Sequence, residues 1–199
     1  MLLVKTNNQG EIEWNQTYGG INEDRAMAVI MDSAGGYVVT GLTQSFGAGK
    51  RDMWLVKTDS SGQPEWNQTF GGQENDYADS LITTSGGGYA LAGRTESTGA
   101  GSEDMWLVKT NSSGQMEWSH TFGGSEEDAA YSVLEISENE FVLVGRTASQ
   151  GTGVSDLWFL KVKMLSHIST TTSLPIFELI FFFIMVLALF NKNKRIIVI

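Results

Sequence analysis

The chain has 199 residues, including 23 Gly, two Pro, six Trp and no Cys. Without Cys it can form neither a disulfide framework nor a thiol-ligated metal centre. Its 13 basic and 23 acidic residues give a formal net charge of −10, which excludes a nucleic-acid-binding protein, because such proteins need a basic surface to displace counterions.

A repeat of 52 residues occupies residues 1–163. The sequence Asp-Met-Trp-Leu-Val-Lys-Thr at 52–58 recurs unchanged at 104–110 and in degenerate form from Asp156 onward. The motif Thr-Tyr/Phe-Gly-Gly keeps the same spacing, at 17–20, 69–72 and 121–124. Three copies without a single insertion indicate one structural unit per period.

The six Trp follow this period in two series of three. One series is Trp14, Trp66 and Trp118, and the other is Trp54, Trp106 and Trp158. Exposed Trp can line a sugar-binding surface, but these recur in every copy inside predicted strands. We therefore expect them to be structural core residues.

Each period predicts four short strands. In one complete period they are residues 53–58, 65–70, 77–84 and 89–95, which are rich in Val, Leu, Tyr, Phe, Trp and Thr. The turn at 59–62, Asp-Ser-Ser-Gly, has an Asx residue to open it and Gly to close it. Along the chain this gives two strands, then four, four and three, which makes 13.

Four antiparallel strands in about 40–50 residues are typical of a β-propeller blade. The sequence from Trp54 through Gly62 and Trp66 to Gly72 resembles the β-propeller repeats of archaeal and bacterial surface proteins. The turn from Asp59 to Trp66 is also similar to the docking turn of quinoprotein propellers and to the Asp box of sialidases, where it is structural. We predict an all-β fold, a partial β-propeller of about three blades. Residues 1–20 would form a partial blade, 21–72 and 73–124 complete blades, and 125–163 a blade without its last strand.

Three blades do not close a ring, because propellers typically have four to eight. Met1 aligns with Met53 and Met105 inside the repeat. One expectation is that further blades and a signal peptide lie upstream of Met1; another is that a second copy of the chain completes the ring. A third is a gene fragment without independent function.

The composition changes after Lys163. Residues 164–173 form a Ser/Thr-rich spacer, residues 174–190 are almost wholly apolar, and residues 191–199 are basic. An apolar helix over 174–190 would be about 25 Å long, at ~1.5 Å per residue, which is the short end of a membrane span. We predict a transmembrane helix in membrane lipid, with the basic tail in the cytoplasm and the propeller outside. The order of segments also resembles the sorting tails of archaeal surface proteins, which implies processing by a membrane enzyme; whether this tail is cleaved stays open.

The candidate ligand- or cation-binding residues are acidic and occupy two repeated positions. One set is Asp24, Asp76 and Asp128, and the other is Asp52, Asp104 and Asp156. Carboxylates in loops suit Ca²⁺, but an Asp directly before a strand commonly accepts hydrogen bonds from loop amides. We favour that structural role and keep Ca²⁺ as the alternative.

We expect no catalytic residue in this chain. The copies look too alike to supply the polar residues that a propeller enzyme needs at its channel mouth. The predicted function is a membrane-anchored binding, adhesion or structural module with a surface glycan or protein as partner. The alternative is a quinoprotein-like or glycan-acting propeller enzyme.

Overall fold

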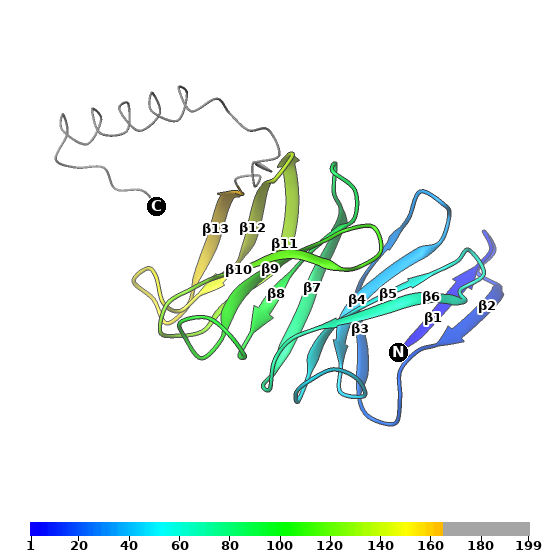
Figure 1. Cartoon of the computed structure of the whole chain (residues 1–199), viewed down its shortest axis with the longest axis horizontal. Coiled ribbons are helices and arrows are strands. Elements are labelled where there is room, and N and C mark those ends of the chain that lie inside the picture. The colour runs from blue at the N-terminus through cyan, green and yellow to red at the C-terminus, as the bar shows by residue number, and fades with distance from the viewer. Residues whose placement is uncertain (165–199) are drawn as a thin grey trace, which may run out of the picture. The chain divides into compact units, whose positions relative to one another are not determined.

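The computed structural model describes residues 1–164. They contain 13 antiparallel strands in four sheets (Figure 1). The number of strands and their distribution among the sheets confirm the prediction. The predicted transmembrane helix at 174–190, the basic tail at 191–199 and the spacer beyond Met164 lie outside the described residues.

The sheets follow one another in chain order. The first sheet contains β1 (Leu2–Thr6) and β2 (Ile12–Thr17). The second contains β3 (Asp24–Met31), β4 (Tyr37–Thr43), β5 (Asp52–Thr58) and β6 (Pro64–Phe70). The third contains β7 (Asp76–Thr83), β8 (Tyr89–Thr95), β9 (Asp104–Thr110) and β10 (Met116–Phe122). The fourth contains β11 (Asp128–Ser137), β12 (Glu140–Thr147) and β13 (Asp156–Lys163).

The turns between third and fourth strands form as their sequence predicts. Asp59 Oδ1 accepts hydrogen bonds from the amides of Ser61 and Gln63 at 2.8 and 2.9 Å. Gly62 has a φ of 81°, a left-handed conformation that costs glycine little. The Asx residue and the glycine therefore fix the hairpin that joins β5 to β6.

Successive sheets pack face to face. Strand β7 packs against β3, β4 and β5, and β11 packs against β7, β8 and β9. In the third sheet, Leu91 belongs to the core shared with the second sheet, whereas its neighbour Ala92 belongs to the core shared with the fourth. Alternate residues of β8 thus point to opposite faces, and both faces of this sheet are buried.

A β-bulge interrupts the first strand of the second, third and fourth sheets. Its extra residues are Met27, Asp79 and Tyr131, which interrupt pairing of β3 with β4, β7 with β8 and β11 with β12. A glycine lies beside each bulge, at Gly41, Gly93 and Gly145. A Cβ on Gly93 would overlap the carbonyl oxygen of Tyr77, so the bulge leaves no room for a side chain there.

The longer connections gather at one edge of the sheets, which we call the loop face. They run from each fourth strand to the next first strand and from each second strand to the third strand. Hydrogen bonds join the two kinds of loop, as between the amide of Glu126 and Ser149 Oγ at 3.1 Å. The loop face lies at the bottom of Figure 1. The short turns lie at the opposite edge, which we call the turn face.

Within the described residues, no helix has the length and apolar character needed to cross a membrane.

Candidate functional site

The first set of candidate Asp residues fastens loops to each other. Asp76 Oδ2 accepts hydrogen bonds from the amide of Gly72 at 2.9 Å and from Ser97 Oγ at 2.7 Å. Asp128 makes the same bonds to Gly124 and Ser149, at 2.9 and 2.6 Å. The same arrangement at the next repeat position joins Asp24 to Gly20 and Ser45, at 2.9 and 2.8 Å. Each carboxylate therefore joins the loop before its own strand to the loop that follows the neighbouring strand.

Each Asp of the second set accepts hydrogen bonds from the amides of one loop only, the loop that precedes its own strand. Asp52 Oδ2 accepts from the amides of Ala48 and Gly49, both at 3.1 Å. Asp156 accepts in the same way from Thr152 and Gly153, both at 3.0 Å. Asp104 accepts from Gly101 at 2.9 Å. All six candidate carboxylates are thus bonded to loop amides.

Carboxylates of the two sets approach each other between sheets. A Cβ placed on Gly71 would lie within 2.5 Å of oxygens of both Asp52 and Asp76, so these oxygens are within about 5 Å of each other. Burial raises the pKa of Asp52, and the charge of Asp76 adds to the effect. Burial also acts to raise the pKa of Asp128, but hydrogen bonds from Ser149, Thr147 and Gly124 outweigh it and lower the pKa.

A Ca²⁺ site needs more oxygen ligands than two carboxylates supply. Across residues 1–164, no group of three or more His, Asp or Glu side chains is placed to hold a metal ion. The geometry of the six Asp residues is that of loop fasteners.

The six Trp lie against apolar side chains. Trp54 and Trp106 are buried in the cores between sheets. Trp66, Trp118 and Trp158 are half-buried and pack against those cores. Trp14 meets Tyr37 edge to face, with ring centroids 5.6 Å apart.

A network of Arg side chains crosses the loop-face half of the three larger sheets. We call it the arginine ladder, and it consists of Arg51, Arg94 and Arg146 with their acidic and Tyr partners. Arg94 binds Asp79 at 3.0 Å and Glu103 at 2.8 Å. Glu103 also binds Arg146, at 3.2 Å. One carboxylate therefore connects arginines from the third and fourth sheets.

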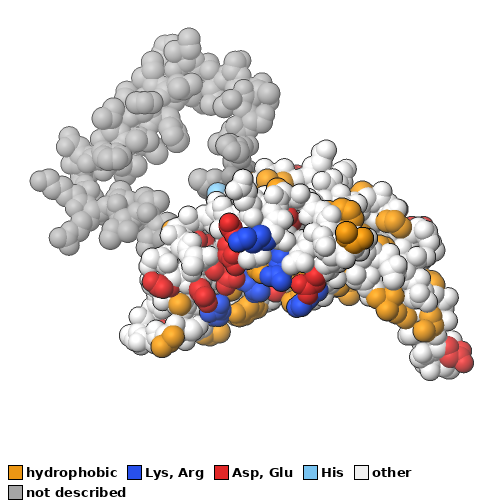
Figure 2. All heavy atoms as spheres, turned by 90° about the horizontal axis from the view of Figure 1, so that it is seen from below, with side chains coloured by type: hydrophobic (Ala, Val, Ile, Leu, Met, Phe, Trp, Pro, Cys, Tyr) orange, Lys and Arg blue, Asp and Glu red, His pale blue; other side chains and the backbone are white. Residues whose placement is uncertain are grey.

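Tyrosines complete the arginine ladder. Tyr77 Oη accepts a hydrogen bond from Arg51 at 3.1 Å, while the guanidinium of Arg94 lies 4.4 Å from the centre of the Tyr77 ring. Arg146 donates to Tyr131 Oη at 2.9 Å. Basic and acidic side chains intermingle on the loop face, seen from below in Figure 2.

The β-bulges place two members of the arginine ladder. Asp79 and Tyr131 are the extra residues of their strands, and a bulge re-aims the side chain at that position. Each side chain bonds the Arg of the paired strand, Arg94 or Arg146. The bulges thus place Asp79 and Tyr131 where they can bond the arginines of the neighbouring strands.

Sequence reasoning missed this network, because the copies were expected to be alike. The three residues 52 apart are not all alike at any of these positions, although two of the first three are Arg: Leu42, Arg94 and Arg146; Arg51, Glu103 and Ser155; Arg25, Tyr77 and Ala129; Met27, Asp79 and Tyr131. The signal was present in the sequence as repeat positions that change chemical class in at least one copy, close to constant positions such as those of Asp76, Gly93 and Thr95.

Two carboxylates of the arginine ladder, Asp79 and Glu103, are mostly buried. Burial raises the pKa of Glu103, and Arg94 and Arg146 partly oppose the rise. Burial likewise raises the pKa of Asp79, against the charge of Arg94. The acids and the arginines are paired with one another, so the ladder presents a rigid surface of fixed donors and acceptors.

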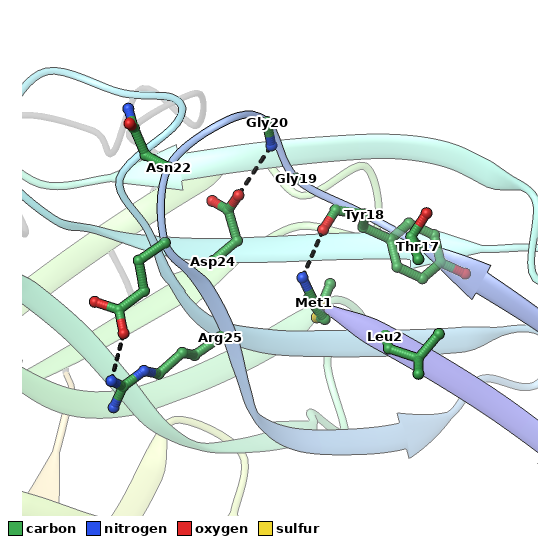
Figure 3. A pocket seen from close by; sticks show the side chains of 10 residues that line it. Met1, Leu2, Thr17, Tyr18, Gly19, Gly20, Asn22, Asp24 and Arg25 are labelled. Atoms are coloured by element: carbon green, nitrogen blue, oxygen red, sulfur yellow. Dashed lines mark hydrogen bonds and ion pairs between the residues drawn. The ribbon is translucent and has the colours of Figure 1, made fainter.

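A hollow of about 630 Å³ opens on the loop face beside the first sheet (Figure 3). The amide of Gly20 donates to Asp24, and the amino terminus of Met1 donates to the carbonyl of Tyr18 at 2.8 Å. Arg25 pairs with Glu23 at its rim. The hollow lies where the sheet that precedes β3 has only two strands.

No family model matches the sequence, and no curated protein matches it at a significant level.

Removing Arg94 tests how firmly the arginine ladder is built. Arg94→Ala is expected to lower the free energy of unfolding by about 2 kcal/mol, because two mostly buried carboxylates lose a partner. The loss is less than the ~3–5 kcal/mol of a fully buried pair, since the side chain of Arg94 is 24% exposed. Urea unfolding of the detergent-solubilised chain, followed by Trp fluorescence, measures it.

The matched control is Lys5→Ala, which breaks the exposed pair of Lys5 with Glu13. Such a pair contributes less than about 1 kcal/mol. Equal losses for the two variants would contradict a structural role for the arginine ladder.

Proposed function

We propose that this chain is a membrane-anchored β-propeller module, displayed outside the cell, that binds a surface glycan or protein through its loop face and performs no catalysis. The stacked four-stranded sheets support a propeller, since the second and third sheets pack face to face and the third is covered on both faces by its neighbours in chain order. The anchor rests on the apolar segment at 174–190 and the basic residues that follow it.

One observation carries the binding role. Repeat positions at which the three copies are not all alike gather in the arginine ladder, whereas the loop-fastening Asp residues repeat in every copy. A scaffold needs the same residues in every copy. A surface that recognises a partner needs particular residues at particular places, and polar surfaces with Tyr and Arg are typical of recognition sites.

Cysteine labelling tests both the location and the binding face, because the natural chain has no Cys. The three test variants are Ser125→Cys in a loop-face connection, Ser112→Cys in a turn-face hairpin and Asn193→Cys in the basic tail. The exposed Ser112 and Ser125 make the first two a matched pair. A membrane-impermeant maleimide is added to intact cells that express the full chain.

We expect positions 112 and 125 to react in intact cells and position 193 to react only after permeabilisation. With its partner bound, position 125 should react more slowly in cells than in the purified chain, whereas position 112 should react equally in both. Labelling of position 112 only after permeabilisation would contradict an outward propeller. Equal rates at position 125 in cells and in purified chain would contradict binding through the loop face.

A further inference from the structure

The outer face of the fourth sheet is apolar, and no residue in 1–164 covers it. Leu157 on β13 is 80% exposed, whereas Met53 and Met105 at the same repeat position are fully buried. Phe159 is 63% exposed, whereas its counterparts on β5 and β9 are fully buried leucines. In the second and third sheets these positions form the core with the next sheet. The same apolar surface forms the contact between the second and third sheets and the contact between the third and fourth sheets. The fourth sheet therefore presents one half of a sheet-to-sheet interface that already occurs twice within the chain.

The other half of that interface lies at the opposite end of the stack. Ala78 and Leu81 on β7 are buried against the second sheet. Their counterparts on β3 are Ala26, which is exposed, and Val29, which is 53% exposed. Both line a groove of about 240 Å³ beside β1. This groove is where the two inner strands of a complete preceding sheet would pack.

The backbone shows the same complementarity. At each internal junction a loop carbonyl accepts a hydrogen bond from the amide that begins the next sheet. The carbonyl of Arg51 accepts from Asp76 at 2.8 Å, and that of Glu103 accepts from Asp128 at 2.7 Å. The corresponding groups at the two ends of the stack are the carbonyl of Ser155 and the amide of Asp24.

The strands also match. In the part of the chain that the structure describes, the fourth sheet has no strand beyond β13, and β2 is paired with β1 alone. In the second and third sheets the fourth strand pairs with the third, as β6 with β5 and β10 with β9. Strand β1 occupies the third-strand place beside β2, in the same register that β13 would take: Leu3 is opposite Gln16 just as Leu55 is opposite Gln68. Strand β1 has one strand partner and packs on the second sheet through Leu3. Because a sheet of only two strands is marginally stable, β1 is the strand most readily replaced.

We propose that a second copy of this chain covers the outer face of the fourth sheet, with Leu157 and Phe159 of one copy packed on Ala26 and Val29 of the other, and with β13 replacing β1 beside β2 of that other copy. Each copy then contributes 12 strands, β2 to β13. Two copies form six four-stranded sheets, which lies within the range of four to eight for a closed propeller. Each end meets the complementary end of the other copy, so the pair closes and has no free face.

This inference rests on the stacked sheets and is independent of the cellular location proposed above. The mass of the detergent-solubilised full chain, by light scattering with the detergent contribution removed, is expected to be twice the 21.8 kDa of one chain. Leu157→Lys should reduce the mass to that of one chain. Val154→Lys is the matched control, because Val154 is an apolar residue with 95% exposure in the preceding loop, and it should leave the pair intact.

Complementary charges test which surfaces meet. Val29→Glu alone should also give single chains, and the double variant Leu157→Lys with Val29→Glu should restore the pair. A wild-type mass of one chain, or an open-ended series of masses, would overturn the proposal. So would equal disruption by Leu157→Lys and Val154→Lys, or no restoration in the double variant.

Crosslinking tests the exchange of β13 for β1, and the absence of natural Cys makes it free of background. Gln16→Cys and Phe159→Cys chains, mixed after separate purification, should form a disulfide between copies, because the register places these positions opposite each other. Ile21→Cys, at a fully exposed position in the loop between β2 and β3 and outside the strand register, should form none with Phe159→Cys. A pair of the expected mass that lacks the 16–159 disulfide would overturn the strand exchange.

Discussion

Replacing Gly93 with Ala is expected to lower the free energy of unfolding by about 3 kcal/mol, at the upper end of ordinary overpacking effects. The carbonyl oxygen of Tyr77 fills the space where a Cβ would stand, and the carbonyl carbon would be 2.8 Å from it. Both obstacles are backbone atoms of β7, so the added methyl group must push two paired strands apart. The bulge at Asp79 and its bond to Arg94 would be distorted as well.

Gly86→Ala is the matched control. Its Cβ would meet no atom closer than 3.9 Å, and its φ is not in the left-handed region. The change should alter stability by less than about 1 kcal/mol, in the stabilising direction, because Ala restricts the unfolded chain more than Gly does. Urea unfolding compares the two variants with wild type. A small effect of Gly93→Ala would show that the bulge is not held by the close approach of β7 to β8.

Asp128→Ala is expected to cost about 3 kcal/mol at neutral pH. The carboxylate is fully buried and accepts from Gly124 and Ser149; each hydrogen bond to a charged group contributes ~1.5–3 kcal/mol, and the stranded donors lose their partners. The pKa of Asp128 is lowered in the folded protein. Its contribution is therefore present above the unfolded pKa of 3.8 and is lost as the pH falls through the lower folded value.

The difference in stability between wild type and Asp128→Ala should accordingly shrink on acidification below pH 3.8. Asp59→Ala provides the comparison, since the pKa of Asp59 is also lowered, first by its hydrogen bond with Ser61, but the residue lies in an exposed turn. It should cost about 1 kcal/mol. Thermal unfolding from pH 7 to pH 3 measures both. A loss for Asp128→Ala no greater than that for Asp59→Ala would contradict its role in joining two loops.

The strands could be predicted closely from the sequence, and the reason is the repeat. Each strand of the repeat occurs in several copies along the chain. A weak preference for β-structure in one copy is therefore supported by the same pattern in the others. The predicted strand at residues 77–84 is observed at Asp76–Thr83, and the predicted strand at 89–95 is observed at Tyr89–Thr95. Turns such as Asp59 to Gly62 have local chemistry that determines where each hairpin reverses.

The arginine ladder could not be predicted in the same way. Strict alternation along a strand assigns each side chain to one of two faces, and one extra residue at Asp79 changes that assignment. Its ion pairs also join residues far apart in the chain, as Glu103 with Arg146. Averaging over repeats, which improved the strand prediction, concealed these positions because they are the ones that differ.

The matched faces of the sheets bear on how such a protein changes over evolutionary time. Each internal junction joins the same two surfaces through the same pair of backbone groups. Deleting or duplicating the gene segment that encodes one 52-residue repeat would therefore leave these same surfaces and backbone groups in contact at every remaining junction. The stack can therefore gain or lose whole sheets in a single recombination event. The number of sheets can therefore change by whole repeats during evolution. The arginine ladder, in contrast, can change only through substitutions at individual positions.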